Sequence, residues 1–549
     1  MARRRIAIVG SGFAGSILAR VLARQGHEVT LLDRGRHPRF ALGESSTPLA
    51  ALSLERLAAR YDLPDLADLA AYGRWRRRLP ELRRGLKRGF TFYAHRPGEP
   101  YTNGPNNDHR LLVAASPSDA VADSHWLRED VDHHLARRAA VAGVELVEGA
   151  EVLTVERHPN AWHLAGRQGE REVRDIHRVA DLLVDASGTG GFLARHLPIA
   201  SALDRVQLRT SLVYGHFADV PSFPAVAKDA SFPPGPYPDE QAAVHHVLEE
   251  GWMYVLPFDH GVVSAGVVLA RPAARERAAR LSPECAWAEI LERYPTLAAQ
   301  WGGAQPVRPI ATVPLLQHRL AQAAGPGWAL LPHAFCFLSP LFSTGIAWSL
   351  LAVERLALLL EEDEAALDSG LDRGLDRYRA LLAREAEQVT RLVEGAYRAA
   401  GRDFDLLAAY SDLYFAAASF AEIRQRLFET ADDGGAWAWQ GFLGSTDPVL
   451  GEALGAILAA LDEILALPPK RLSDNVKGRF AAEVGRAIAP RNLAGLADPS
   501  RNRLYPVDLA PLLTGAPLLG LSEAALRQRT DRLRGATEDG AEVWPADRS

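Results

Sequence analysis

The stretch of sequence that decides the fold is residues 6–33, IAIVGSGFAGSILARVLARQGHEVTLLD. It begins with a short apolar run typical of a buried strand. Gly10, Gly12 and Gly15 follow in the spacing G-x-G-x-x-G. A helical segment and a second apolar run complete the pattern, which ends at Asp33. Strand, glycine turn, helix, strand and terminal acid together indicate a dinucleotide-binding βαβ unit.

Each residue of this signature has a chemical reason. Gly10 allows a tight turn, Gly12 lets the backbone approach a pyrophosphate, and Gly15 lets the helix pack closely on the strand. The helix N-terminus presents free N–H groups and a partial positive charge to the phosphates. Asp33 can accept hydrogen bonds from a ribose. The stretch therefore predicts a nucleotide cofactor, whose identity must come from the rest of the chain.

Composition limits the class of protein. A chain of 549 residues is long enough for more than one domain, and its net charge of −6 argues against general nucleic-acid binding. Two cysteines provide neither a disulfide framework nor a cysteine metal site, so we expect a reducing, cytoplasmic environment and no metal. Residues 320–353 carry no Asp, Glu, Lys or Arg, but prolines and glycines interrupt them. They are interpreted as a buried loop plus helix rather than a membrane span.

Further elements follow from local patterns. Residues 125–140 are predicted to form one helix, in which Arg128 and Asp132 lie one turn apart and can pair. Residues 182–191, LLVDASGTGG, are predicted to form a strand that ends at Asp185 in a glycine turn. That turn is either a second approach of backbone to the nucleotide or an ordinary turn. Residues 205–220 and 252–269 suggest an inserted antiparallel sheet.

The chain is rich in arginine but has four lysines, Lys87, Lys228, Lys470 and Lys477. A lysine can lose its proton when buried, whereas arginine stays charged, so a retained lysine hints at reactivity. Lys87 is the last residue but one of the basic run 74–88, just before a predicted strand at residues 89–94. A solvated face is the favoured interpretation of that run, and docking of an acidic carrier protein or an anionic substrate is the alternative.

The motifs together resemble the flavin-dependent halogenases, a family within the para-hydroxybenzoate-hydroxylase-like flavoproteins. They are GSGFAG, GESSTP, Lys87 before a strand, Arg128 with Asp132, DASGTGG, W-x-Y-x-L-P and SPLFSTGI, in this order between residue 6 and about residue 360. The members that act on phenolic or pyrrolic substrates are the most similar. The helical C-terminal third resembles the family in kind only.

The resemblance implies an α/β fold with a Rossmann-like FAD-binding domain, an inserted antiparallel substrate sheet and a helical C-terminal region. We expect FAD-binding residues at 1–200, including the Lys87 segment, and the substrate sheet at 201–320. An FAD-binding return segment with a halide loop is expected at 321–375, and the helical region at 376–549.

The resemblance also assigns site residues. Gly10, Gly12 and Gly15 would hold the FAD pyrophosphate and Asp33 the ribose. The residues expected to contact or brace the flavin are Glu44, Ser45, Arg128, Asp185, Gly345 and Ile346. The expected halide pocket is Ser343, Thr344 and Gly345. The residues expected to line the substrate site or tunnel are Trp252, Tyr254, Pro257 and Phe342.

In the family, reduced FAD comes from a separate flavin reductase and, with oxygen and chloride or bromide, yields hypohalous acid. That species would pass through a tunnel to Lys87, which directs it onto an electron-rich aromatic ring, phenolic, pyrrolic or carrier-bound. Lysine suits this role because it can donate a hydrogen bond to the oxidant or become a chloramine. A desolvated site would help by lowering its pKa.

The chain departs from the family pattern at four places. Tyr254 replaces a tryptophan, Pro332-His333 replace a Gly-Asp pair, and Ser339 replaces an aspartate. Phe342 stands where tryptophan halogenases have a glutamate base, which disfavours indole chemistry; a phenol directs its own substitution. Two other functions stay open: a flavin monooxygenase or oxidoreductase on the same scaffold, and a non-catalytic flavin- or lipid-binding protein.

Overall fold

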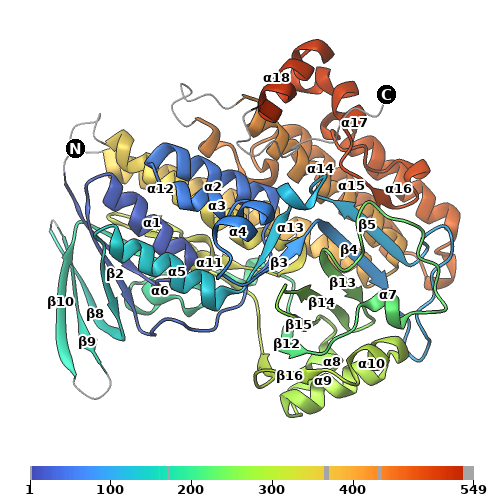
Figure 1. Cartoon of the computed structure of the whole chain (residues 1–549), viewed down its shortest axis with the longest axis horizontal. Coiled ribbons are helices and arrows are strands. Elements are labelled where there is room, and N and C mark those ends of the chain that lie inside the picture. Colours follow the sequence, from blue (N-terminus) through green and yellow to red (C-terminus); the bar gives the residue numbers. More distant parts are fainter. Residues whose placement is uncertain (1–2, 160, 170–172, 364–369, 429–435, 536–549) are drawn as a thin grey trace.

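The computed structural model describes residues 3–159, 161–169, 173–363, 370–428 and 436–535. Three parts are visible in Figure 1: a parallel sheet with helices, a second large sheet, and helices that gather toward the C-terminus. A single hydrophobic core runs through the first and third parts, since Ile8, Leu350 and Leu454 belong to one buried cluster. The C-terminal helices therefore share a core with the nucleotide-binding part.

The first sheet has the strand order β19-β20-β11-β1-β2-β7, and all neighbouring pairs except β19–β20 are parallel. Its strands are β1 (Arg5–Val9), β2 (Glu28–Asp33), β7 (Glu145–Glu148), β11 (Leu182–Asp185), β19 (Ala324–Gly325) and β20 (Trp328–Leu330). The helices that accompany it are α1 (Phe13–Arg24), α5 (Arg128–Val141) and α6 (Phe192–His196). The βαβ unit predicted from residues 6–33 is confirmed as β1, α1 and β2.

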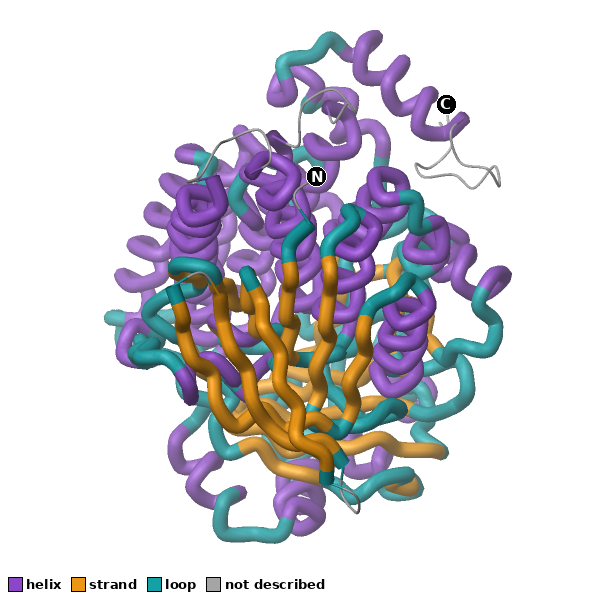
Figure 2. The backbone as a smooth tube through the Cα atoms, turned by 90° about the vertical axis from the view of Figure 1, so that its left-hand side faces the viewer, coloured by secondary structure: helices purple, strands orange, loops and turns teal. Residues whose placement is uncertain are grey.

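Three antiparallel strands stand beside this sheet: β8 (Ala150–His158), β9 (Ala161–Gln168) and β10 (Arg174–Ala180). They lie at the left of Figure 1, and Figure 2 shows the strands of this side facing the viewer with helices beyond them. Trp162 on β9 fixes the ribbon, because its Nε1 donates to the carbonyl of Gly327 at 2.7 Å.

The second large sheet has the order β16-β12-β15-β14-β13-β4-β5-β22, with β17 paired to β12. Its strands are β4 (Gly89–Ala94), β5 (Arg110–Ala114), β12 (Ser211–Ala218), β13 (Ala243–Val247), β14 (Gly251–Pro257), β15 (Val263–Leu269), β16 (Gln305–Pro306), β17 (Ala311–Val313) and β22 (Leu504–Tyr505). The strands from residues 201–320 pair with one another antiparallel, which confirms the expected inserted antiparallel sheet. The parallel pairs β4–β13 and β5–β22 both involve strands from outside that segment. The sheet thus combines the segment 201–320 with β4 and β5 from earlier in the chain and β22 from near its C-terminus.

Short helices cover the outer face of this sheet: α7 (Phe223–Val226), α8 (Pro272–Ala278), α9 (Pro283–Glu292) and α10 (Pro295–Trp301). Trp287 and Trp301 pack there against Phe217 of β12, with ring centroids 4.8 Å and 5.1 Å from it. This apolar layer closes the outer side of the sheet, so the opposite side faces the rest of the molecule.

The helical parts complete the structure. The N-terminal part supplies α2 (Pro48–Tyr61), α3 (Pro64–Asp68) and α4 (Tyr72–Arg78). The long helices are α12 (Thr344–Asp363), α13 (Gly370–Ala400), α14 (Phe404–Phe428), α15 (Pro448–Leu465) and α16 (Asp474–Ile488), followed by α17 (Leu509–Thr514) and α18 (Glu523–Gly535). The boundary expected at residues 375–376 lies within α13.

One predicted helix begins later than expected. Residues 123–126 form strand β6 (Asp123–Trp126), which pairs antiparallel with β3 (Arg84–Lys87), and α5 begins only at Arg128. The helical prediction for residues 125–127 was therefore wrong, because pairing with a segment about 40 residues away outweighs the local pattern. The β3–β6 ribbon carries Lys87.

Within the described residues, one helical stretch is long and apolar enough to cross a membrane, Leu341–Glu361. Of the most apolar 18-residue segment of this stretch, 94% is buried inside the protein. It is the core helix α12 with the turn before it, which agrees with the interpretation of residues 320–353 as a buried loop plus helix.

Candidate functional site

A cavity of about 1460 Å³ lies where the carboxyl ends of β1 and β11 meet the N-termini of α1 and α12. Pockets for small ligands are typically about 300–1,000 Å³, so this one has room for a large cofactor. Predicted site residues that line it are Gly10, Gly12, Asp33, Glu44, Ser45, Arg128, Trp252, Tyr254, Ser343, Thr344, Gly345 and Ile346. Gly15, Lys87, Asp185, Pro257 and Phe342 lie outside the set of described residues that line it.

The glycine turn has the geometry predicted for it. Gly10 has φ +112°, and a Cβ built there would lie 2.4 Å from the carbonyl oxygen of Ala186. A Cβ on Gly15 would lie 2.0 Å from the carbonyl oxygen of Gly10. Gly15 therefore shapes the turn by close packing, and Gly10 and Gly12 present its backbone to the cavity.

Asp33 lies at the cavity edge and holds the loop that follows β2. It accepts hydrogen bonds of 2.8 Å from the backbone N and the Oγ of Ser11, from the N of Gly35, and from Arg39. Burial acts to raise the pKa of Asp33, but Arg39 and the donated hydrogen bonds outweigh it and lower that pKa. The carboxylate is thus ionised, and four donors already orient it.

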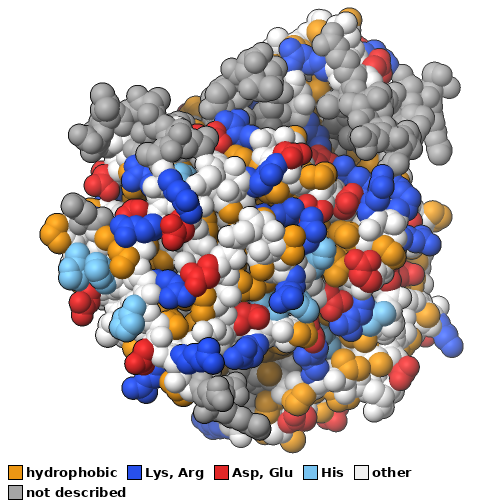
Figure 3. Space-filling view, turned by 60° about the vertical axis from the view of Figure 1, so that its left-hand side comes forward, with side chains coloured by type: hydrophobic (Ala, Val, Ile, Leu, Met, Phe, Trp, Pro, Cys, Tyr) orange, Lys and Arg blue, Asp and Glu red, His pale blue; other side chains and the backbone are white. Residues whose placement is uncertain are grey.

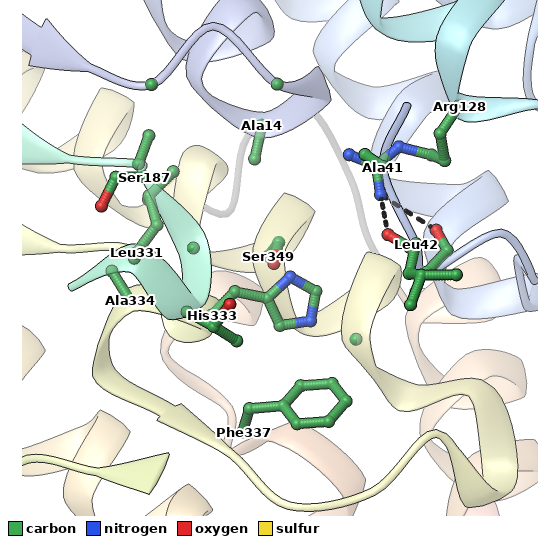
Figure 4. Close-up of a pocket in the computed structure, with 18 of the residues that line it drawn as sticks. Ala14, Ala41, Leu42, Arg128, Ser187, Leu331, His333, Ala334, Phe337 and Ser349 are labelled. Atoms are coloured by element: carbon green, nitrogen blue, oxygen red, sulfur yellow. Dashed lines mark hydrogen bonds between the residues drawn. The ribbon is translucent and has the colours of Figure 1, made fainter. Parts of the chain in front are cut away.

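Arg128 and Asp132 form the pair predicted from their spacing, and it is buried. Arg128 reaches the two carboxylate oxygens of Asp132 at 2.9 and 2.8 Å, and its other amino group donates to the carbonyls of Leu42 and Gly43. Figure 4 shows these last contacts at the rim of the cavity. Asp132 also accepts from the N of Phe13, so the pair ties α5 to the start of α1.

Residues 44–46 connect the cavity to three other parts of the molecule. Glu44 accepts from Ser264 at 2.6 Å and contacts Nε2 of His216 at 3.0 Å, both on the second sheet. The Oγ atoms of Ser45 and Ser343 are 3.0 Å apart. The carbonyl of Ser46 accepts from Nζ of Lys87 at 2.5 Å.

Asp185 braces the second glycine turn from behind. Its fully buried carboxylate accepts from the N and Oγ of Ser187 and from the N of Leu193, at 2.9, 2.6 and 2.7 Å. Burial raises the pKa of Asp185. Residues 186–190 of this turn line the cavity, which favours the prediction of a second backbone approach to a nucleotide.

The expected halide loop contains two consecutive non-glycine residues in the left-handed region, Phe342 (φ +68°) and Ser343 (φ +53°). Such a conformation is uncommon for bulky residues and persists where the surroundings enforce it. Tyr414 of α14 donates its hydroxyl to the carbonyl of Phe342 at 2.7 Å and stacks on its ring at 4.2 Å. Phe342 thus packs against Tyr414 and Phe415, outside the set of described residues that line this cavity, and its place in a substrate site or tunnel stays a prediction.

His333 projects into the cavity in front of the start of α12 (Figure 4). A Cβ on Gly345 would lie 2.4 Å from its Nε2, so Gly345 leaves the space that the imidazole fills. Burial, and then the charge of Arg128, lower the pKa of His333 to about 3. The residue that replaces the family's aspartate is therefore neutral at ordinary pH.

Two aromatic residues of β14 face the cavity as predicted. Trp252 donates its Nε1 to the hydroxyl of Tyr397 on α13 at 2.7 Å, and that hydroxyl lies 2.8 Å from Oγ of Ser339. The ring of Tyr254 covers Gly266 of the next strand. Pro257, at the end of β14, contacts Gly85 of β3 instead, because its carbonyl lies 2.0 Å from a Cβ built there.

Lys87 is fully buried on β3, next to the cavity rather than in it. Its Nζ lies 4.1 Å from the ring centre of Phe90. Burial lowers the pKa of Lys87, and the carboxylate of Asp123 opposes that shift. His245 of β13 lines the cavity and is close enough to Lys87 for the lysine charge to lower its pKa further.

At least four of the eight basic residues in the run 74–88 form ion pairs with acidic side chains. The pairs are Arg74 with Glu55, Arg83 with Asp130, Arg84 with Asp259, and Arg88 with Asp119. Basic and acidic side chains are also interspersed over the face shown in Figure 3. These pairs favour the solvated-face interpretation of the run over a docking site.

Sequence reasoning missed several residues that support the site. Tyr397 and Tyr414 come from the C-terminal helices, and Asp123 and His245 come from strands whose local pattern carries no functional signal. Only the strand pairing brings Asp123 opposite Lys87.

The cavity and the glycine turn of the parallel sheet define a dinucleotide-binding protein. A family model described as FAD dependent oxidoreductase matches residues 5–355. The chain belongs to this family and, within it, to the flavin-dependent halogenases.

Two curated relatives and one solved structure illustrate this placement. The tetracycline 7-halogenase of Kitasatospora aureofaciens is 30% identical over 390 residues, which cover 66% of this chain and 67% of that protein. The monodechloroaminopyrrolnitrin halogenase PrnC of Pseudomonas fluorescens is 27% identical over 361 residues, covering 65% and 61%. The crystal structure of halogenase PltM with phloroglucinol and FAD superposes with a TM-score of 0.79 at 22% identity, covering 91% of this chain and 99% of that one.

Proposed function

We propose that this enzyme is a halogenase that uses reduced FAD, oxygen and chloride or bromide to halogenate an electron-rich aromatic ring. A phenolic, pyrrolic or carrier-bound aromatic is the proposed substrate class. The observation that carries the proposal is a fully buried lysine beside a cofactor cavity, joined through residues 44–46 to the loop at the start of α12. The names of the relatives and the phloroglucinol bound by PltM support the substrate class.

The residues around the cavity fit FAD. Gly10 and Gly12 would present backbone to the pyrophosphate at the start of α1, and the turn at residues 186–190 would approach the cofactor from the other side. Asp33 would orient the adenosine ribose, and Arg128 would hold the rim. Bound in reduced form, FAD supplies the activation of oxygen. A separate flavin reductase would supply the reduced cofactor.

The start of α12 is the proposed halide site. Ser343 and Thr344 line the cavity at the N-terminus of a 20-residue helix, where backbone N–H groups and the helix dipole favour an anion. The left-handed turn at Phe342 and Ser343 sets the direction in which the helix begins.

Lys87 would direct the halogen. As an ammonium it donates a hydrogen bond to the oxygen of hypohalous acid. The carbon–halogen bond forms while the halogen–oxygen bond breaks, and the departing hydroxide becomes water by taking up the proton that the ring loses. As an amine it would form a haloamine instead. His245, which borders both the cavity and Lys87, marks the proposed route between them.

The test is mass spectrometry of reactions that contain FAD, a flavin reductase, NADH, oxygen and a panel of phenols and pyrroles. Parallel reactions contain chloride, bromide or neither. A product with the halogen isotope pattern, absent without halide, is expected. Oxygenated product regardless of halide would instead identify a monooxygenase, and FAD binding without any product would favour a non-catalytic flavoprotein.

A further inference from the structure

Lys87 has an acidic neighbour on the opposite strand of its ribbon. In the antiparallel pairing of β3 with β6, Lys87 is directly opposite Asp123. Directly opposite residues have Cβ atoms about 4.5–5.5 Å apart and project to the same face of the ribbon. Both side chains are buried, with exposures of 0% and 4%. An amine and a carboxyl group therefore share one compartment closed to solvent.

The polar groups of this compartment are incompletely satisfied. An ammonium has three donors, and the hydrogen bond of Lys87 to Ser46 uses one of them. Oδ2 of Asp123 and Nδ1 of His125, two residues further along β6, have no hydrogen-bond partner among the described residues. The described contacts include no direct ion pair between Lys87 and Asp123. A buried polar atom without a partner needs an explanation, and a catalytic role is one.

Other charges reach the compartment from α14 and β13. Glu422 and Arg426 of α14 act on Asp123 in opposite directions, and Arg426 is itself paired with Glu422 and Glu55. The charge of Asp123 raises the pKa of the Tyr414 hydroxyl. The charge of Lys87 lowers the pKa of His125 and of His245. Burial keeps both histidines neutral by lowering the pKa of each to about 3. Asp123 is therefore the carboxylate that opposes the deprotonation of Lys87 by burial.

We propose that Asp123 is a positioning residue that keeps a proton on Lys87 and so decides whether the lysine presents an ammonium or an amine. The consequence for halogen transfer rests on the proposed function; the electrostatic link between the two residues does not. The two groups form one coupled unit, so their protons leave in steps that belong to the pair. Burial raises the pKa of Asp123, and the charge of Lys87 opposes that rise. Burial lowers the pKa of Lys87, and the charge of Asp123 opposes that fall.

A structural role alone explains this arrangement poorly. A buried charge pair is weak evidence for stability, because desolvation offsets much of the attraction, and apolar residues of similar size are often as stable. Lys87 and Asp123 make no direct ion pair among the described contacts, so their attraction recovers little of the free energy that desolvation costs. The carboxylate is better explained by its effect on the amine.

The experiment is an NMR titration of the whole chain with lysine labelled with ¹³C at Cε. Four lysines give four signals, and the Lys87 signal is the one missing from Lys87→Met. In the unaltered protein we expect the Lys87 signal to titrate below the other three and to carry a second inflection from Asp123. In Asp123→Asn the second inflection disappears and the midpoint moves down by about 1 to 3 pH units, as expected when an opposite charge at this range is removed.

The matched control is Asp119→Asn. Asp119 is an exposed carboxylate whose ion pair is with Arg88, the residue next to Lys87. Its removal should leave the Lys87 titration unchanged. A Lys87 midpoint that is equal in Asp123→Asn and in the unaltered protein would overturn the proposal. If Asp123→Asn does not fold, the unaltered protein decides: a Lys87 titration without a second inflection from Asp123 overturns it equally.

The titration needs neither FAD, halide nor substrate, so it separates this proposal from the proposed function. Where halogenation is established, the pH profile gives a second readout. Activity that depends on the ammonium should fall at lower pH in Asp123→Asn than in the unaltered enzyme, and Asp123→Glu should restore part of the range. A Lys87 titration that shifts in Asp123→Asn, in a protein that does not halogenate, would support the electrostatic link between Asp123 and Lys87 and refute the proposed halogenase function.

Discussion

The hydroxyl oxygens of Ser45 and Ser343 are 3.0 Å apart and join the segment after β2 to the start of α12, 298 residues later in the chain. Both serines line the cavity. Through Ser46, the neighbouring residue, the same segment receives the hydrogen bond of Lys87. The proposed halide loop and the proposed catalytic lysine thus depend on one short stretch of backbone.

Ser45→Ala should weaken use of the halide more than binding of FAD. Loss of one hydrogen bond of this kind is worth about 0.5–1.5 kcal/mol, or roughly a 2- to 10-fold rise in the halide concentration for half-maximal rate. Ser343→Ala should do the same, and the double variant should cost less than the sum because both changes remove one interaction. Fully additive effects would mean that the two hydroxyls act independently.

Lys87→Met should abolish halogenation while FAD binding persists. FAD binding should persist because Lys87 does not line the cavity. Without the lysine charge, burial favours the protonated, uncharged form of Asp123. Halogenated product and flavin fluorescence quenching are measured together. Lys228→Met, at an exposed position, is the control and should behave as the unaltered enzyme. Halogenation that survives in Lys87→Met would remove the role proposed for this lysine.

Gly345→Ala should impair FAD binding because the new methyl group would meet the imidazole of His333. The built Cβ lies 2.4 Å from Nε2, closer than real side chains approach, so the ring must move within the cavity. We expect at least a 10-fold weaker Kd for FAD by fluorescence titration. The double variant Gly345→Ala with His333→Ala should recover most of the affinity, and failure to recover would place the cause elsewhere than in this contact.

Tyr414→Phe should disturb the left-handed turn. The change removes the donor to the carbonyl of Phe342 and leaves the ring stack in place. A buried acceptor without its partner costs about 1–3 kcal/mol of unfolding free energy, measurable by denaturant titration. Halide use should decline with it. Tyr410→Phe, the same change in α14 at a hydroxyl that contacts Arg391, should leave halide use unaltered.

The rate of halogenation should fall as pH rises through about 8, the value to which burial lowers the pKa of Lys87. Below that pH the residue is an ammonium and can donate to the oxidant; above it the amine predominates. A steady-state pH profile of halogenated product, with FAD saturating at each pH, tests this. A rate that rises through the same range would instead favour the haloamine route.

Much of the nucleotide-binding part follows from sequence because its signals are local. The glycine spacing at residues 10–15 needs neighbours within a few positions only. The strand predicted at residues 89–94 is β4 with the same bounds, and the Arg128–Asp132 pair forms one turn apart on α5. Each of these elements is decided by residues that lie next to one another in the chain.

The rest depends on pairings between distant segments. The β3–β6 ribbon joins a basic run to the start of a predicted helix, and neither segment alone has the alternation of a strand. Tyr397 and Tyr414 lie within helical sequence where a tyrosine is most simply a core residue. Their hydroxyls acquire meaning only when α13 and α14 pack against the cavity.

The family match ends at residue 355, yet two hydroxyls from beyond it reach back to the site: Tyr397 holds Trp252 and Tyr414 holds Phe342. The C-terminal helices therefore help to position residues of the site from outside the segment that the family model matches. A chimera that keeps residues 1–355 and takes its C-terminal helices from a relative would keep the proposed catalytic residue Lys87. It would lack the hydroxyls of Tyr397 and Tyr414 that hold Trp252 and Phe342. Laboratory evolution directed only at α13 and α14 could retune which halide and which ring the enzyme accepts.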